Sequence, residues 1–141
     1  MIDKDLLLAK LSTIKRCLNS IVKVTENNPE KLEDVFVQDV FVINLQRAVQ
    51  ASLDIANILI SYHDYELPTS YKNSFQILAN HKVISKEIQD KLIKMIGFRN
   101  IAVHDYQTLD LVILKKILEF HLGDFDSFMK HIHTNYILDK D

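Results

Sequence analysis

Hydrophobic side chains recur at helical spacing along most of the chain. Between residues 4 and 26 the apolar positions fall at steps of three and four, which predicts one stripe along an amphipathic helix. The residues of this stripe are Leu7, Leu11, Ile14, Leu18 and Ile21. Asp3 or Asp5 can cap the start of this helix or complement its dipole. Asn27-Asn28-Pro29 then predicts its end.

The next stretch carries a signal for strands at first and then predicts a central helix. Residues 35–37 and 40–43 are β-branched or aromatic, which favours strands. We nevertheless expect a helix over about 38–62, because its middle has a helical period and no turn signal. This helix is apolar over most of its circumference, as is typical of the centre of a bundle. Its polar residues fall near one line, which we expect to face solvent, a subunit interface or a cleft. They are Asn44, Arg47, Asp54, Asn57 and Ser61, with Gln50 close by.

The second half of the chain predicts one short and two long helices. The short helix follows a loop over 63–70 and ends near Asn80. The next begins after Ser85 as N-cap, and the last begins at about Thr108 with a kink at Gly123. The fold class is therefore all-α, an antiparallel bundle of four long helices plus one short helix. We expect a single domain over residues 1–141.

Composition supports this picture and narrows the cellular location. Hydrophobic residues make up 48% of the chain and charged residues 26%, with only two glycines and two prolines. One cysteine, Cys17, excludes an intramolecular disulfide and suits a reducing compartment. Residues 1–5 lack the basic start of a signal peptide. No apolar run reaches the roughly 18 residues that a membrane span requires. We therefore expect a cytoplasmic protein that does not associate with membranes.

Charge is unevenly distributed along the chain. The net charge of −2 argues against broad nucleic-acid binding. Residues 71–104, however, carry six cations and two anions, a local charge of +4, which leaves −6 for the rest. A basic stretch beside a candidate site suits a polyanionic substrate. The other interpretation is a solvated lysine face on one helix.

The candidate chemistry lies within residues 98–106, which combine a fixed cation, an amide, an imidazole and a phenol. On a helix, Asn100 and His104 share a face, as do Arg99 and Tyr106. Arg99 and His104 are about 140° apart around an ideal helix, and long side chains can still converge on one ligand from there. A break near Asp105 would alter that angle.

These residue types suit metal-independent cleavage of RNA. Arg99 would grip a phosphate and stabilise the charge on the phosphorane, while His104 moves a proton from the attacking 2′-hydroxyl. Asn100 could orient the imidazole, and Tyr106 could bond the phosphate or stack on a base. A two-fold homodimer would supply both an acid and a base. The competing interpretation is a chance pair, with His104 complementing the helix dipole.

The remaining histidines do not predict a metal site. They have no matched set of carboxylates or thiols, so we expect neither a metal nor a cofactor. These four histidines are His63, His121, His131 and His133.

Residues 95–106 resemble the signature of HepT-type HEPN proteins, Arg-x4-His-x-Tyr in a Gly-Phe-Arg-Asn context. The segment around Arg47 and Asp54, the length and the helix order are also similar to that family. The resemblance implies an all-α homodimer that acts as a ribonuclease toxin, with Arg99 and His104 as the catalytic pair in a cleft between protomers. It also implies a partner, the minimal nucleotidyltransferase antitoxin MntA, which neutralises the toxin by attaching AMP to Tyr106.

Three points stay open at the level of sequence. Asp105 stands where many family members have glycine, and it could raise the proton affinity of His104 or repel RNA. The chain could instead be a non-catalytic helical subunit of a nucleotidyltransferase complex, or a structural dimer with a chance motif. Arg47 and Asp54 either support the catalytic residues or form a buried ion pair that fixes helix register, and we favour the ion pair.

Overall fold

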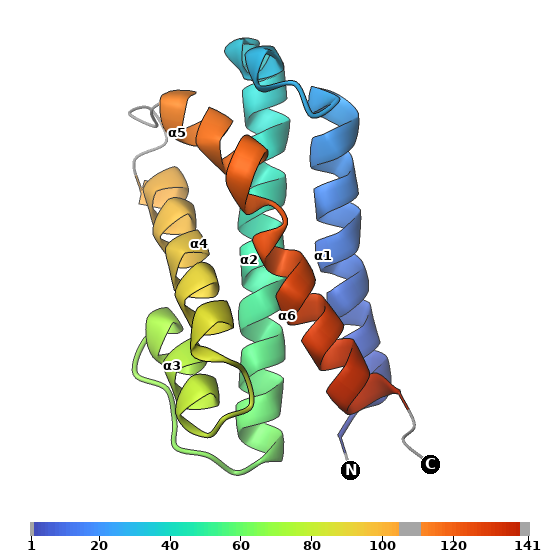
Figure 1. Cartoon of the computed structure of the whole chain (residues 1–141), viewed down its shortest axis with the longest axis vertical. Coiled ribbons are helices and arrows are strands. Elements are labelled where there is room, and N and C mark those ends of the chain that lie inside the picture. Colours follow the sequence, from blue (N-terminus) through green and yellow to red (C-terminus); the bar gives the residue numbers. More distant parts are fainter. Residues whose placement is uncertain (1, 105–110, 139–141) are drawn as a thin grey trace.

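The computed structural model describes residues 2–104 and 111–138, except the side chains of 101–104. Over these residues every regular element is helical and no strand occurs. Two long antiparallel helices, α1 (Lys4–Thr25) and α2 (Val35–Tyr62), are joined by the 3₁₀ turn η1 (Pro29–Glu33) (Figure 1). The remaining elements are α3 (Tyr71–Asn80), α4 (Lys86–His104), α5 (Leu111–Lys116), η3 (Ile117–His121), α6 (Asp124–Ile132) and η4 (His133–Ile137).

The arrangement confirms the predicted all-α antiparallel bundle. Figure 1 shows α2 between α1 and α4, with the short α3 at one end of α4. The C-terminal arm, defined as residues 111–137, crosses in front of α2 and ends near the start of α1. No helix in the described part of the chain is long and apolar enough to cross a membrane.

The strand-like residues near position 40 are helical. Helix α2 begins at Val35, about three residues earlier than predicted, and runs for 28 residues. Asp34 caps it by accepting hydrogen bonds from the backbone N–H groups of Phe36 (2.8 Å) and Val37 (3.3 Å). Burial of Phe41 and Val42 in the core then outweighs their intrinsic preference for strands.

The C-terminal arm is broken where the kink was predicted. Leu122 and Gly123 separate η3 from α6, which divides the expected last helix into pieces. The π-helical η3 accounts for part of the bend, because an i→i+5 turn interrupts the regular helical ladder. Gly123 itself has an ordinary right-handed φ of −66°. The predicted start at Thr108 lies outside the described residues.

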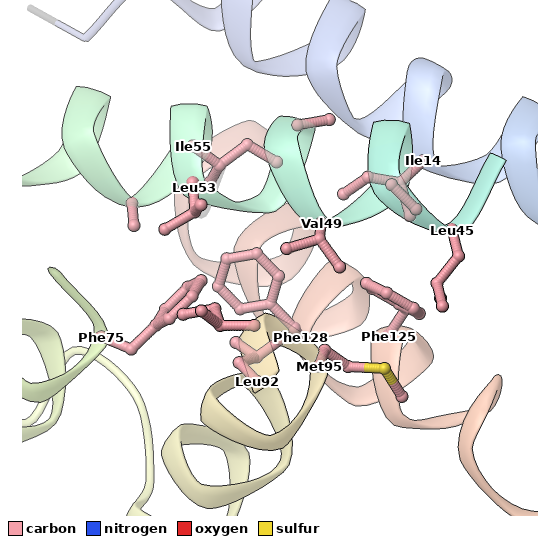
Figure 2. Packing of buried hydrophobic residues seen from close by; sticks show 14 of the residues in the cluster. Ile14, Leu45, Val49, Leu53, Ile55, Phe75, Leu92, Met95, Phe125 and Phe128 are labelled. Atoms are coloured by element: carbon pink, nitrogen blue, oxygen red, sulfur yellow. The ribbon is translucent and has the colours of Figure 1, made fainter. Parts of the chain in front are cut away.

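The core forms around α2, between α1, α3, α4 and α6. Leu45, Val49 and Leu53 of α2 point toward residues of α4 and α6 in Figure 2. Phe75 of α3 and Phe128 of α6 meet edge to face, with ring centroids 6.0 Å apart. The predicted stripe of α1 lies inward, with Leu7, Leu11, Ile14 and Ile21 buried and Leu18 partly buried. Burial of Leu92, Met95 and Ile96 fixes α4 against this core.

Candidate functional site

Arg99 lies near the C-terminal end of α4, immediately beyond the part of the helix that enters the core. Its side chain is half-buried and that of Asn100 is exposed. Because α4 is helical through His104, the backbones of Arg99 and His104 are offset by about 140° around the axis and about 7.5 Å along it. The side chain of His104 and all of Asp105 and Tyr106 lie outside what the structure describes.

Two neighbouring helices orient the Arg99 guanidinium. Its Nη2 donates a hydrogen bond to Oε1 of Gln50, on α2, over 3.2 Å. Its central carbon lies 4.9 Å from the centroid of the Tyr71 ring, at the start of α3. A hydrogen bond at one edge and an aromatic face restrict a planar group more tightly than either contact alone. The orientation of Arg99 is therefore set by contacts outside its own helix.

The contact with Gln50 continues across α2 to α1. Gln50 Nε2 donates to Asp54 Oδ1 over 3.0 Å, and Lys10 Nζ donates to Asp54 Oδ2 over 2.9 Å. The side chains of Lys10 and Asp54 are 34% and 33% exposed, so water screens this ion pair only in part. We call Lys10, Asp54, Gln50 and Arg99 the polar row. It connects α1, α2 and α4.

The preferred interpretation of Arg47 and Asp54 as a buried ion pair is wrong. Asp54 binds Lys10 and Gln50, whereas Arg47 is exposed. The two residues lie seven positions apart on α2, so their backbones are separated by about 10.5 Å along the axis. Lys10 on the adjacent helix reaches the carboxylate directly. The structure thus brings Asp54 within one side chain of Arg99 and leaves Arg47 at the surface.

Arg47 does act electrostatically on a buried thiol. Burial raises the pKa of Cys17 above its ordinary value, and the positive charges of Arg47 and Arg16 partly oppose that rise. The thiol is therefore mostly protonated at neutral pH, and Cys17 behaves as a small core residue.

Three of the six polar residues that fall near one line on α2 contact a neighbouring helix. Gln50 reaches α4 and Asp54 reaches α1. Asn57 Oδ1 accepts a 3.0 Å hydrogen bond from Ser74 Oγ on α3. Asn44 is buried and donates to the carbonyl of Val40 in its own helix. Gln50 could have been suspected from its place in the stripe. Tyr71 carries no comparable signal in the sequence.

Three of the histidines named above have hydrogen-bond partners within the fold. His63 Nε2 lies 2.8 Å from the Tyr136 hydroxyl, and His121 Nδ1 lies 3.1 Å from Asp124 Oδ2. His131 is hydrogen-bonded to the carbonyl of Val83. Over residues 2–104 and 111–138, no group of three or more His, Cys, Asp or Glu side chains is placed to hold a metal ion. These contacts account for His63, His121 and His131 as structural groups, whereas His133 is exposed.

Comparison with known proteins places the chain in a family. Residues 14–132 match the family described as ribonuclease HepT-like. The mRNA nuclease HepT of Shewanella oneidensis is 40% identical over 125 residues, which cover 89% of this chain and 94% of that protein.

Solved structures agree with this assignment. The tri-AMPylated HEPN toxin of Shewanella oneidensis, in complex with its MNT antitoxin, has a TM-score of 0.88 and 39% identity, over 93% of this chain and 98% of that chain. The cytosolic protein YutE of Bacillus subtilis has a TM-score of 0.81 at 20% identity, over 99% of this chain and 96% of that chain, which supports the fold alone. The family match covers most of the chain and the first relative is similar nearly throughout, so this protein belongs to the ribonuclease HepT-like family.

Proposed function

We propose that this protein is the toxin of a toxin–antitoxin pair and that it cleaves RNA in the cytoplasm without a metal ion. The observation that supports this most is the placement of Arg99. Its half-buried guanidinium is oriented by Gln50 and Tyr71, five positions before His104 on one continuous helix. The 40% identity to an mRNA nuclease supports RNA as the substrate class.

The proposed reaction is an internal transesterification. The 2′-oxygen attacks the adjacent phosphorus as His104 takes the 2′-hydroxyl proton, and a bond from phosphorus to the 2′-oxygen forms. The bond to the 5′-oxygen breaks, and that oxygen receives a proton, which leaves a 2′,3′-cyclic phosphate and a 5′-hydroxyl. Arg99 stabilises the extra negative charge on the phosphorane. Asn100, four positions before His104, is the residue that we expect to orient the imidazole.

A homodimer would complete this chemistry. One chain offers a single motif histidine, whereas the reaction needs both a base and an acid. A two-fold axis near the end of α4 would supply the second imidazole. The test is to mix wild-type chains with an excess of His104→Ala chains, because each mixed dimer then keeps only one motif imidazole. Cleavage that falls below the share of wild-type chains would support a shared site, whereas cleavage in proportion to the wild-type chains, or by a monomer alone, would contradict it.

The nuclease assignment is tested by RNA cleavage in EDTA. We expect wild type to cut RNA, and Arg99→Ala and His104→Ala each to lose roughly 100-fold or more. Arg16→Ala and His133→Ala are the matched controls, because both side chains are exposed and come from other elements. Equal cleavage by all five proteins would remove the mechanism. Tight partner binding without any cleavage would instead support a non-catalytic helical subunit.

We further propose that a minimal nucleotidyltransferase is the partner and attaches AMP to Tyr106. The related Shewanella toxin is tri-AMPylated in its complex with the MNT antitoxin. Adenylyl phosphates two residues after His104 would compete with RNA for the charge of Arg99. Intact mass after co-expression should rise by whole AMP units, and Tyr106→Phe should abolish the rise. Tyr71→Phe is the control, because Tyr71 also lies beside Arg99. A rise that survives Tyr106→Phe would place the modification elsewhere.

A further inference from the structure

Arg99 contacts a neutral oxygen, although a carboxylate lies close behind it. The acceptor for Nη2 is the amide oxygen of Gln50, and Asp54 is reached only through the other end of that amide. A direct contact between guanidinium and carboxylate would be a strong, charge-assisted pair. Such a pair would occupy N–H donors of Arg99 and cancel most of its charge at the place where a phosphate has to bind.

We propose that Gln50 is a positioning residue that acts as an uncharged spacer between Asp54 and Arg99. It holds the guanidinium in place while keeping the negative charge of Asp54 one side chain away. The inference rests on the proposed role of Arg99 as the group that binds the RNA phosphate. It adds Gln50 and Asp54 to the residues on which that role depends.

The chemistry of the two partners fixes the orientation of the spacer. An ionised Asp54 can only accept hydrogen bonds, so the NH₂ group of Gln50 must face it. A guanidinium can only donate, so the amide oxygen must face Arg99. The reversed amide would place a donor against a donor and an acceptor against an acceptor. Asp54 therefore holds Gln50 in the one orientation that binds Arg99.

The charges along the polar row leave the net positive charge at Arg99. Lys10 and Asp54 form an ion pair and cancel each other, and Gln50 is neutral. Among the described residues, Gln50 accepts from one of the five N–H donors of the guanidinium, and the Tyr71 ring lies over the guanidinium without accepting from any of them. The donors that no described residue binds suit bidentate binding of two phosphate oxygens.

Two substitutions separate the positioning role from the spacing role. Gln50→Glu keeps the shape of the side chain and places a carboxylate against Arg99. Gln50→Met keeps the length and the neutrality but removes both hydrogen bonds. Gln38→Glu is the matched control, since it adds the same charge to α2 twelve positions earlier, about 18 Å along the helix axis.

The first measurement is the salt dependence of binding to a single-stranded 2′-O-methyl RNA oligonucleotide, which cannot be cleaved. For single strands the slope of log K against log salt changes by about 0.7 for each phosphate contact. We expect the slope for Gln50→Glu to be smaller in magnitude by about 0.7 for every Arg99 that contacts a phosphate, as we expect for Arg99→Ala. Gln50→Met and Gln38→Glu should keep the wild-type slope, because neither changes the charge at Arg99.

The second measurement is the rate of RNA cleavage at saturating substrate. We expect Gln50→Met to lower kcat by roughly 10- to 100-fold while its salt slope stays unchanged, because a misplaced catalytic group slows the reaction without losing its charge. A residue that only stabilised the fold would not separate kcat from binding in this way. Circular dichroism checks that each variant is folded.

Three results would contradict the proposed role of Gln50 as a spacer. The first is a salt slope in Gln50→Glu equal to that of wild type, and the second is a wild-type kcat in Gln50→Met. The third is a salt slope in Arg99→Ala equal to that of wild type. Failure of the wild-type protein to cleave RNA would overturn the proposed nuclease function instead. The binding slopes would still test the spacer in that case, because they do not require turnover.

Discussion

Truncation of Phe128 tests how strongly the C-terminal arm is fastened to the core. Phe128 is 0% exposed, and its ring meets Phe75 edge to face at an interplanar angle of 89°. Phe128→Ala should lower the free energy of unfolding by about 3–5 kcal/mol, which combines the lost burial with the cavity left behind. The aromatic pair accounts for roughly 0.5–1.5 kcal/mol of this loss, beyond the buried area. A domain of this kind has only about 5–15 kcal/mol in total.

The assay is urea unfolding followed by circular dichroism, because the chain has no tryptophan to report by fluorescence. The double-mutant cycle with Phe75→Ala isolates the coupling between the two rings. Phe120→Ala is the matched control from the same arm, since that ring is 66% exposed and should change stability by less than about 0.5 kcal/mol. A loss below about 1 kcal/mol for Phe128→Ala, or an equal loss for Phe120→Ala, would refute the packing argument.

Three further predictions concern single groups. Asp34→Ala removes the cap of α2 and should cost about 1 kcal/mol in urea unfolding; a cost no larger than that of the exposed Asp39→Ala would contradict the capping role. Burial, then the nearby tyrosines, raises the pKa of Tyr136 from 10.0 to about 12, which favours the neutral phenol in the fold. The contribution of Tyr136 to the free energy of unfolding is therefore complete below pH 10 and disappears as the pH rises through about 12. If Tyr136→Phe and wild type lose stability identically between pH 10 and 12, this reasoning is refuted. Cys17 is buried, and burial also raises the pKa of its thiol, so a thiol reagent should label it only when the fold transiently opens around it. Rapid labelling of the folded protein would contradict the buried position.

Most of the fold follows from hydrophobic period and capping residues. The inward stripe of α1 and the start of α4 after Ser85 agree with the structure, because each is a local pattern that needs no knowledge of distant partners. The start of α2 was placed too late, since strand propensity near Val35 obscured the cap at Asp34. The π-helical turns were missed, because no residue type marks an i→i+5 bond in advance.

The candidate site was only partly predictable, for a related reason. Arg99 was identified from its spacing to His104, which is a property of the sequence itself. The contacts of Arg99 come from α2 and α3, and they depend on how those helices pack. The predicted pair of Asp54 with Arg47 is wrong, because spacing along α2 does not show which side chains of a neighbouring helix come close, and the partner of Asp54, Lys10, lies on α1.

The position of Lys10 makes the first helix part of the support for Arg99. The Lys10 ammonium neutralises the Asp54 carboxylate, which holds Gln50, although Lys10 lies far from the motif along the chain. Loss of the opening turns of α1 would therefore leave Asp54 without its counter-ion and remove the buried Leu7, although the sequence of the motif would be unchanged. A shortened variant of that kind would resemble an active-site mutant in its behaviour, even though its motif was intact.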